Sequence, residues 1–180
     1  MVGVMIVGIA VAVSGVVAFV GLRDSPPSSR VTPVTDRGEL DRMGAAALAL
    51  VRYDPSEVGY TISFEPGRDD VRAQSDRSSK AIGVFLRRGD LPHVVAHDIA
   101  HELGHAYDQQ HLDARARGAY LSRRGVPSAA WLPDGPSDYG VGAGDFAEVF
   151  ALCHAASPDF RSTLAPRPEN PCDLLPVGAR

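Results

Sequence analysis

The sequence predicts an α+β domain, with helices packed on a short mixed sheet, behind an N-terminal transmembrane helix. Three observations lead to this expectation. The chain has 180 residues, which is enough for one domain with a single core. Its N-terminal segment is apolar and carries no charge before Arg23. Beyond this segment, apolar residues alternate in two short stretches and recur at helical spacing in three longer ones.

Residues 1–22 form the apolar segment. About 20 apolar residues in a helix cross the hydrocarbon core of a bilayer, so we expect a transmembrane anchor. A cleaved signal peptide is the alternative, but its apolar region is shorter and is followed by small residues, whereas this segment ends with Phe19 and Val20 near its boundary. Residues 23–36 are rich in Pro and Ser and are expected to form an extended linker.

The side of the membrane on which the domain lies is left open by two opposing signals. Basic residues follow the anchor and none precedes it, which by the positive-inside rule places the domain in the cytoplasm. The two cysteines, Cys153 and Cys172, would persist as a disulfide only in an oxidising compartment. We expect a single-pass membrane protein with an extracytoplasmic domain. The sequence leaves open both the topology and the pairing of the two cysteines.

The folded domain is expected to cover residues 37–165, followed by a Pro-rich tail at residues 166–180. Asp36 and Glu39 have the spacing of a capping box before an Ala- and Leu-rich run, which predicts a first helix that ends near Val51.

Two strands are expected after this helix. Tyr60, Ile62 and Phe64 alternate with smaller or polar residues, which is typical of a half-buried strand. The polar stretch 68–80 shows no periodicity. The apolar run Ala81–Leu86 predicts the second strand.

Two more helices complete the expected domain. Asp90 is expected to cap a helix that has Pro92 in its first turn and ends near Gln109. Residues 111–142 are rich in Gly, Pro, Arg and Ser and are expected to be mostly irregular, with a helical turn at residues 129–132. The last helix is expected at residues 143–156, and the chain after it is expected to be coil.

The second of these three helices carries an HExxH motif, His-Glu-Leu-Gly-His, at residues 101–105. His101 and His105 lie one turn apart on the same helix face, so both imidazoles can reach one metal ion. Glu102 then lies beside the water that the metal activates. The motif predicts a zinc site with Glu102 as the general base, and such a site needs a third protein ligand.

Three sets of residues are candidates for that third ligand. Glu148 is preferred, because the apolar face of its helix would pack on the HExxH helix and direct this carboxylate at the two histidines. His111 is at the spacing of the third histidine of metzincins, but Asp108 replaces the glycine of that pattern. Asp134 and Asp138, in the irregular segment, are the third option.

Other charged and polar residues flank the motif. His97 lies one turn before His101 and is interpreted as a packed residue or as a partner of a ligand side chain. Asp98 and Asp108 could each accept a hydrogen bond from the far nitrogen of a ligand histidine, or be solvated helix residues.

Two segments resemble a known group of metallopeptidases. They are the HExxH motif with its continuation Ala106-Tyr107-Asp108, and Asp-Phe-Ala-Glu-Val-Phe at residues 145–150. This group includes the catalytic domain of anthrax lethal factor and the secreted Pro-Pro endopeptidases, and the resemblance covers residues 80–156. It implies a zincin-like fold of the gluzincin type. It also implies that His101, His105 and Glu148 hold zinc and that Glu102 serves as general base and acid.

The resemblance also implies a tyrosine that stabilises the oxyanion, shortly before the glutamate ligand. The matching residue is Tyr139, although its spacing to Glu148 is longer than in the group, and Tyr120 and Tyr107 are alternatives. In zincins an edge strand upstream of the active-site helix pairs with the extended substrate, and Ala81–Leu86 is expected to be this strand.

These observations predict a membrane-anchored zinc endopeptidase that hydrolyses peptide or protein substrates through a metal-activated water. A non-catalytic zinc-binding or interaction domain on the same fold is the alternative, as is a metzincin-type enzyme with His111 as the third ligand. The chain has 18 basic and 22 acidic residues, a net charge of −4, which argues against nucleic acid as a partner.

Overall fold

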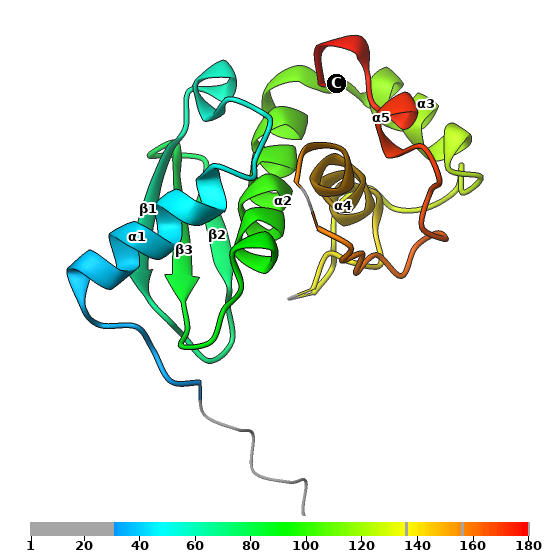
Figure 1. The fold of residues 1–180 in the computed structure, drawn as a ribbon. Helices are drawn as coiled ribbons and strands as arrows, with labels where there is room; N and C mark the ends of the chain where they lie inside the picture. Colours follow the sequence, from blue (N-terminus) through cyan, green and yellow to red (C-terminus); the bar gives the residue numbers. More distant parts are fainter. Residues whose placement is uncertain (1–30, 136, 156, 180) are drawn as a thin grey trace, which may run out of the picture.

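A computed structural model describes residues 31–135, 137–155 and 157–179. Over these ranges the chain is an α+β fold with five α-helices packed on a small, three-stranded mixed sheet (Figure 1). The coarse fold class is therefore as predicted. The expected anchor at residues 1–22 and residues 23–30 of the linker lie outside the described residues. No helix in the described part of the chain is both long and apolar enough to cross a membrane.

The sheet has the strand order β1-β3-β2. Strand β3 runs parallel to β1 and antiparallel to β2. The strands are β1 (Thr61–Pro66), β2 (Ala73–Asp76) and β3 (Ala81–Leu86). Strands β1 and β3 lie where alternation and the apolar run predict them. Strand β2 lies inside the polar stretch that was expected to be irregular, because its residues have little intrinsic preference for a strand.

Strand β3 is the middle strand, so the expectation that Ala81–Leu86 is the substrate-binding edge strand is wrong. The edge beside the HExxH helix is β2 instead. The carbonyl of Arg72 accepts a hydrogen bond from the N–H of Phe85, so the peptide groups of Arg72 face β3. The backbone N–H and C=O groups of successive residues in a strand point to opposite sides. The N–H and C=O of Ala73 and of Ser75 therefore face the free edge of β2.

The described residues form five α-helices. They are α1 (Arg37–Leu48), α2 (Pro92–His111), α3 (Ala114–Arg123), α4 (Gly142–His154) and α5 (Pro171–Leu174), and two short 3-10 helices, η1 (Pro55–Val58) and η2 (Val177–Ala179), accompany them. Helices α1 and α2 pack against the sheet, and α4 packs on α2. The carboxylate of Asp36 caps α1 by accepting the N–H of Glu39, as predicted. The cap predicted for α2 is wrong: the N-cap is Leu91, and Asp90 instead accepts the backbone N–H of Arg87.

Helix α3 lies in the segment that was expected to be irregular. Asp113 caps it by accepting the N–H of Ala116. Only Tyr120 and Leu121 of its ten residues are buried, so the sequence carries little helical periodicity there. The helical turn expected at residues 129–132 is not formed in the described structure, where these residues are coil and bends.

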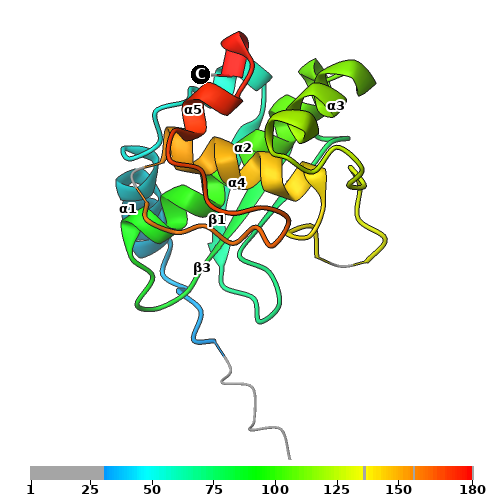
Figure 2. The ribbon, with the colours of Figure 1, turned by 90° about the vertical axis from the view of Figure 1, so that its right-hand side faces the viewer.

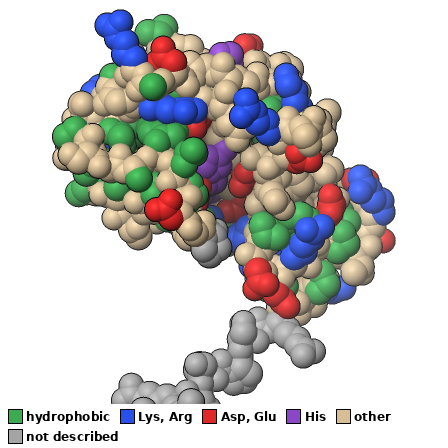
Figure 3. Space-filling view, turned by 180° about the vertical axis from the view of Figure 1, so that it is seen from behind, with side chains coloured by type: hydrophobic (Ala, Val, Ile, Leu, Met, Phe, Trp, Pro, Cys, Tyr) green, Lys and Arg blue, Asp and Glu red, His purple; other side chains and the backbone are tan. Residues whose placement is uncertain are grey.

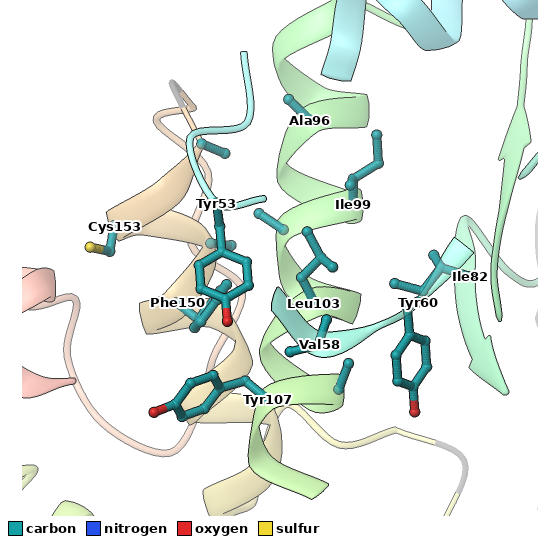
Figure 4. Packing of buried hydrophobic residues seen from close by; sticks show 14 of the residues in the cluster. Tyr53, Val58, Tyr60, Ile82, Ala96, Ile99, Leu103, Tyr107, Phe150 and Cys153 are labelled. Carbon is teal, nitrogen blue, oxygen red and sulfur yellow. The ribbon is translucent and has the colours of Figure 1, made fainter. Parts of the chain in front are cut away.

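Helix α2 lies at the centre of the domain, between the sheet and α4 (Figures 1 and 2). Ile99 and Leu103 of α2 and Phe150 of α4 belong to the same buried cluster (Figure 4). Gly104 permits a close approach of the two helices, because a Cβ atom there would lie 2.8 Å from the Cα of Ala147. The HExxH motif is therefore held rigidly between two layers.

The chain after α4 returns over this helix and ends beside it (Figure 2). Cys153 of α4 and Cys172 of α5 form a disulfide, which answers the question that the sequence left open. The side chain of Leu175 is buried in the core next to this connection. The tail, expected to be coil, therefore contains α5 and is tied to α4.

Candidate metal centre

Two histidines of α2 and one loop aspartate form a group that could hold a metal ion. The Nε2 atoms of His101 and His105 are 3.1 Å apart. The Oδ2 of Asp138 lies 2.7 Å from the Nε2 of His105 and 3.5 Å from that of His101. The first two residues are the predicted ligands, and the third was one of the alternatives.

The donor set fits a catalytic zinc ion. Ligand atoms about 2.0–2.1 Å from a tetrahedral zinc ion are about 3.3 Å from one another, and the observed distances of 2.7, 3.1 and 3.5 Å lie on both sides of this value. Two imidazole nitrogens and one carboxylate oxygen leave a fourth position for water. The side chains of His105 and Asp138 are 17% and 24% exposed, so the group opens towards solvent.

Glu148, the preferred third ligand, lies on the opposite edge of the His101 ring. Its Oε1 is 2.8 Å from the Nδ1 of His101, and the side chain is fully buried. Because Nδ1 and Nε2 point in different directions, a carboxylate bound at Nδ1 does not share a metal held at Nε2. Asp138, and not Glu148, therefore lies with the two Nε2 atoms that could share a metal ion, and the assignment of Glu148 as the third ligand stays a prediction.

Gly144, in the first turn of α4, leaves space for the loop that brings Asp138 to the histidines. A Cβ atom on Gly144 would clash with the backbone oxygen of Asp138 and lie 2.9 Å from its Cγ. The N–H of Val141 donates to the carbonyl of Asp138, which closes the turn before the helix. Asp134, the other loop candidate, is exposed and is not part of the group.

The buried carboxylate of Glu148 binds three donors. It accepts from His101, from the Nε2 of His97 at 3.1 Å, and from the backbone N–H of Arg161. Burial raises the pKa of Glu148, but the hydrogen bonds from the two histidines outweigh burial and hold this pKa well below its ordinary value. Since an ionised carboxylate only accepts, His101 must donate from Nδ1, which turns the lone pair of its Nε2 towards the metal group.

The metal group also shifts its own pKa values. Burial lowers the pKa of His101, but the carboxylates of Asp138 and Glu148 outweigh burial and raise it well above its ordinary value. Burial likewise raises the pKa of Asp138, but hydrogen bonds from His101 and His105 lower it far below its ordinary value. In the absence of a metal ion, the two carboxylates beside His101 therefore favour the protonated form of its ring.

Glu102 lies in the same cleft as the metal group and faces the sheet. Its Oε2 accepts the N–H of Ser75, at 2.9 Å, from the free edge of β2. The cleft has a volume of about 430 Å³ and lies between β2, α2 and the loop at residues 137–139. The surface view shows histidine side chains in a hollow between two lobes (Figure 3). The predicted general base is therefore next to the metal group without being one of its members.

Tyr139 is the candidate tyrosine that lines this cleft. Its ring lies 5.7 Å from that of His101, edge-on. The two alternatives lie elsewhere: Tyr120 is buried and donates to Asp145 at 2.7 Å, and Tyr107 packs against aromatic residues of α4. The structure thus brings together Tyr139 and the metal group.

Other residues singled out in the sequence have different surroundings. His111 is exposed at the end of α2 and its ring lies 4.6 Å from that of Tyr107. Asp108 accepts from Arg117 at 2.8 Å and from Trp131 at 3.0 Å. It supports α3 and the chain before the Asp138 loop.

Two arginines that the sequence did not single out form one wall of the cleft. Arg72 and Arg161 bind opposite oxygens of Asp98, at 2.7 and 2.6 Å. They come from 26 and 63 residues away in the chain, so no local pattern indicates them. Asp98 therefore fixes the strand edge and the segment after α4 to α2.

Comparisons of the chain with protein-family models, with curated proteins and with solved structures find no match. What the site does is therefore inferred from its own residues.

Proposed function

We propose that the domain is a zinc-dependent endopeptidase that cleaves an extended segment of a peptide or protein. One observation carries this proposal. The group of His101, His105 and Asp138 lies beside Glu102, in a cleft that has the free edge of β2 as a wall. A metal group, a carboxylate that does not belong to it and an open strand edge are the parts that peptide hydrolysis needs.

The proposed chemistry divides between the metal and Glu102. Zinc, when bound, acts as a Lewis acid on a water molecule and on the peptide carbonyl. Glu102 accepts the proton of the attacking water and passes it to the nitrogen of the leaving amine. The N–H of Ser75 holds one oxygen of Glu102 and so fixes the direction of the carboxylate.

Tyr139 is proposed to stabilise the oxyanion. Its position in the cleft, with its ring next to that of His101, supports this role, because a donor held beside the site can stabilise charge that develops there.

The free edge of β2 is proposed to bind the substrate backbone. The N–H and C=O of Ala73 face this edge, so an extended peptide can add to the sheet as a further strand. Such binding selects an extended backbone, whereas the side chains that line the cleft select the sequence.

The resemblance to the lethal factor and Pro-Pro endopeptidase group supports the same class of reaction, with an aspartate in place of the glutamate ligand. The disulfide of Cys153 and Cys172 supports an oxidising, extracytoplasmic location, since such bonds are rare in the cytosol. With residues 1–22 as an anchor, the enzyme would act at a membrane surface.

The test compares cleavage of a peptide library by the wild-type chain and by Glu102→Gln, with zinc content measured in both. We expect equal zinc and cleavage only by the wild type. Glu169→Gln changes an exposed glutamate and is the matched control, which should cleave normally. Zinc binding without any Glu102-dependent cleavage would favour the alternative, a non-catalytic zinc-binding or interaction domain.

A further inference from the structure

A second histidine shares the carboxylate that holds His101. His97 lies one turn earlier on α2, is fully buried, and places its Nε2 3.1 Å from the Oε1 of Glu148. This is the same oxygen that binds the Nδ1 of His101 at 2.8 Å. One carboxylate oxygen therefore joins two consecutive turns of the helix that carries the metal group.

Packing alone does not favour histidine at this position. The other ring nitrogen of His97, Nδ1, is buried and has no hydrogen-bond partner among the described residues. A buried polar atom without a partner is unfavourable, and an apolar side chain of similar volume would avoid it. The one polar contact of the His97 ring among the described residues is the hydrogen bond from its Nε2 to Glu148.

This hydrogen bond fixes the orientation of the carboxylate. The backbone N–H of Arg161 binds the second oxygen of Glu148, so both oxygens are held. Without His97, Oε1 would keep His101 as its one imidazole partner, and the carboxylate could turn and take the ring of His101 with it. A rotation of this ring moves its Nε2 away from His105 and Asp138.

We propose that His97 is a positioning residue of the metal centre, which acts through Glu148 to hold the imidazole of His101 in the orientation that binds the metal. The inference rests on the proposed metal centre and not on the peptidase reaction. It adds to the HExxH motif a third histidine that does not touch the metal.

The test uses zinc and cobalt binding to the full chain. His97→Leu removes the donor and keeps a similar volume, whereas His97→Gln retains an N–H donor that can reach Glu148. His93→Leu changes a half-buried histidine one further turn away and is the matched control. The measurements are the zinc dissociation constant, by competition with a chelator, and the visible spectrum of the Co²⁺-loaded protein, which reports the geometry of the ligands.

We expect His97→Leu to weaken zinc binding about tenfold, the effect typical of residues that orient a metal ligand, and to alter the Co²⁺ spectrum. His97→Gln should restore most of both properties, and His93→Leu should leave both unchanged. A folded His97→Leu protein with wild-type zinc affinity and spectrum would show that His97 only packs.

A second measurement does not depend on any variant. In the zinc-loaded wild-type chain, nitrogen NMR should find His97 as the neutral tautomer with its proton on Nε2. A proton on Nδ1 alone would overturn the inference. Failure of the wild type to bind zinc would remove both proposals, whereas zinc binding without peptide cleavage would remove only the peptidase.

Discussion

Asp138 and Glu148 bind the two nitrogens of the same imidazole, and they differ in almost every other respect. Asp138 lies in a loop, is 24% exposed and shares the Nε2 side of His101 with His105. Glu148 lies in a helix, is fully buried and binds Nδ1. The edge of the ring that a carboxylate reaches thus decides whether it lies with the two Nε2 atoms that could hold a metal ion or on the far side of the imidazole.

The packing of α2 on α4 explains this division. The helices are so close at Gly104 that a Cβ atom there would lie 3.0 Å from the Cβ of Phe150. The same Cβ atom on Gly104 would lie 2.8 Å from the Cα of Ala147. Glu148 follows Ala147 and is therefore enclosed between the helices, where it meets the inner edge of His101. The outer edge faces the cleft, where the loop before α4 places Asp138.

The largest expected effect is that of Asp138→Ala on zinc affinity. Loss of a ligand should weaken binding by more than the 10–100-fold that typically follows loss of an orienting partner. Chelator competition measures this, and Asp134→Ala, which removes an exposed carboxylate from the same loop, should bind zinc like the wild type.

Glu148→Gln should have the second largest effect. The amide keeps the shape of the side chain but not its charge, so His101 loses a strong acceptor at Nδ1, and we expect zinc affinity to fall by about 10–100-fold with one zinc still bound per chain. If Glu148→Gln abolished zinc binding and Asp138→Ala did not, the roles of the two carboxylates would be the reverse of those described here.

Gly144→Ala tests how the loop reaches the metal group. The new Cβ atom meets Asp138, so the loop must shift, and we expect zinc affinity to fall by about tenfold, the lower end of the range for orienting groups. Gly140→Ala is the control, because a Cβ atom there would be 3.6 Å from the Oγ1 of Thr163, an ordinary contact. Equal effects of the two substitutions would refute this account of the loop.

The smallest expected change in zinc affinity is its dependence on pH. The raised pKa of His101 means that zinc must displace a proton at pH values where an ordinary histidine, with a pKa of about 6.5, is already neutral. Zinc affinity should therefore still rise with pH above that value.

The stability of the zinc-free domain should change in the opposite sense. The contribution of the His101 ion pairs to the free energy of unfolding is complete below about pH 6.5 and is lost as the pH rises through the raised pKa of His101.

A zinc titration at several pH values, followed by thermal unfolding of the zinc-free chain, checks both signs. In Glu148→Gln one of the carboxylates that raise the pKa of His101 is absent, so affinity should level off at a lower pH. An affinity that levels off at the same pH in both proteins would contradict the electrostatic role of Glu148.

Much of the fold and the two histidines of the metal group follow from local patterns, whereas the carboxylate of the group does not. Helices α1, α2 and α4 and strand β3 have clear periodicity or an apolar run, and all four lie where they were predicted. Strand β2 and helix α3 bury few side chains, so their sequences carry weak patterns. The HExxH spacing predicts His101 and His105 because one helix turn sets their geometry.

The positions of the two carboxylates beside His101 depend on contacts between distant segments. Glu148 has the more favourable sequence context, on an apolar helix that packs on α2, and this packing is what buries it behind His101. Asp138 lies in a segment without periodicity, and the signal that could have indicated it is the glycine at position 144, which leaves space for the loop. Local patterns thus indicate the helices that carry the site, whereas the edge of the His101 ring that each carboxylate reaches depends on packing between segments far apart in the chain.

The most direct measurement is a crystal structure of the zinc-loaded chain, with zinc located by its anomalous scattering. The account predicts bonds of about 2.0–2.2 Å from zinc to the Nε2 atoms of His101 and His105 and to one carboxylate oxygen of Asp138. Glu148 should remain hydrogen-bonded to the Nδ1 of His101. A zinc ion bound by Glu148, with Asp138 turned away, would contradict the account.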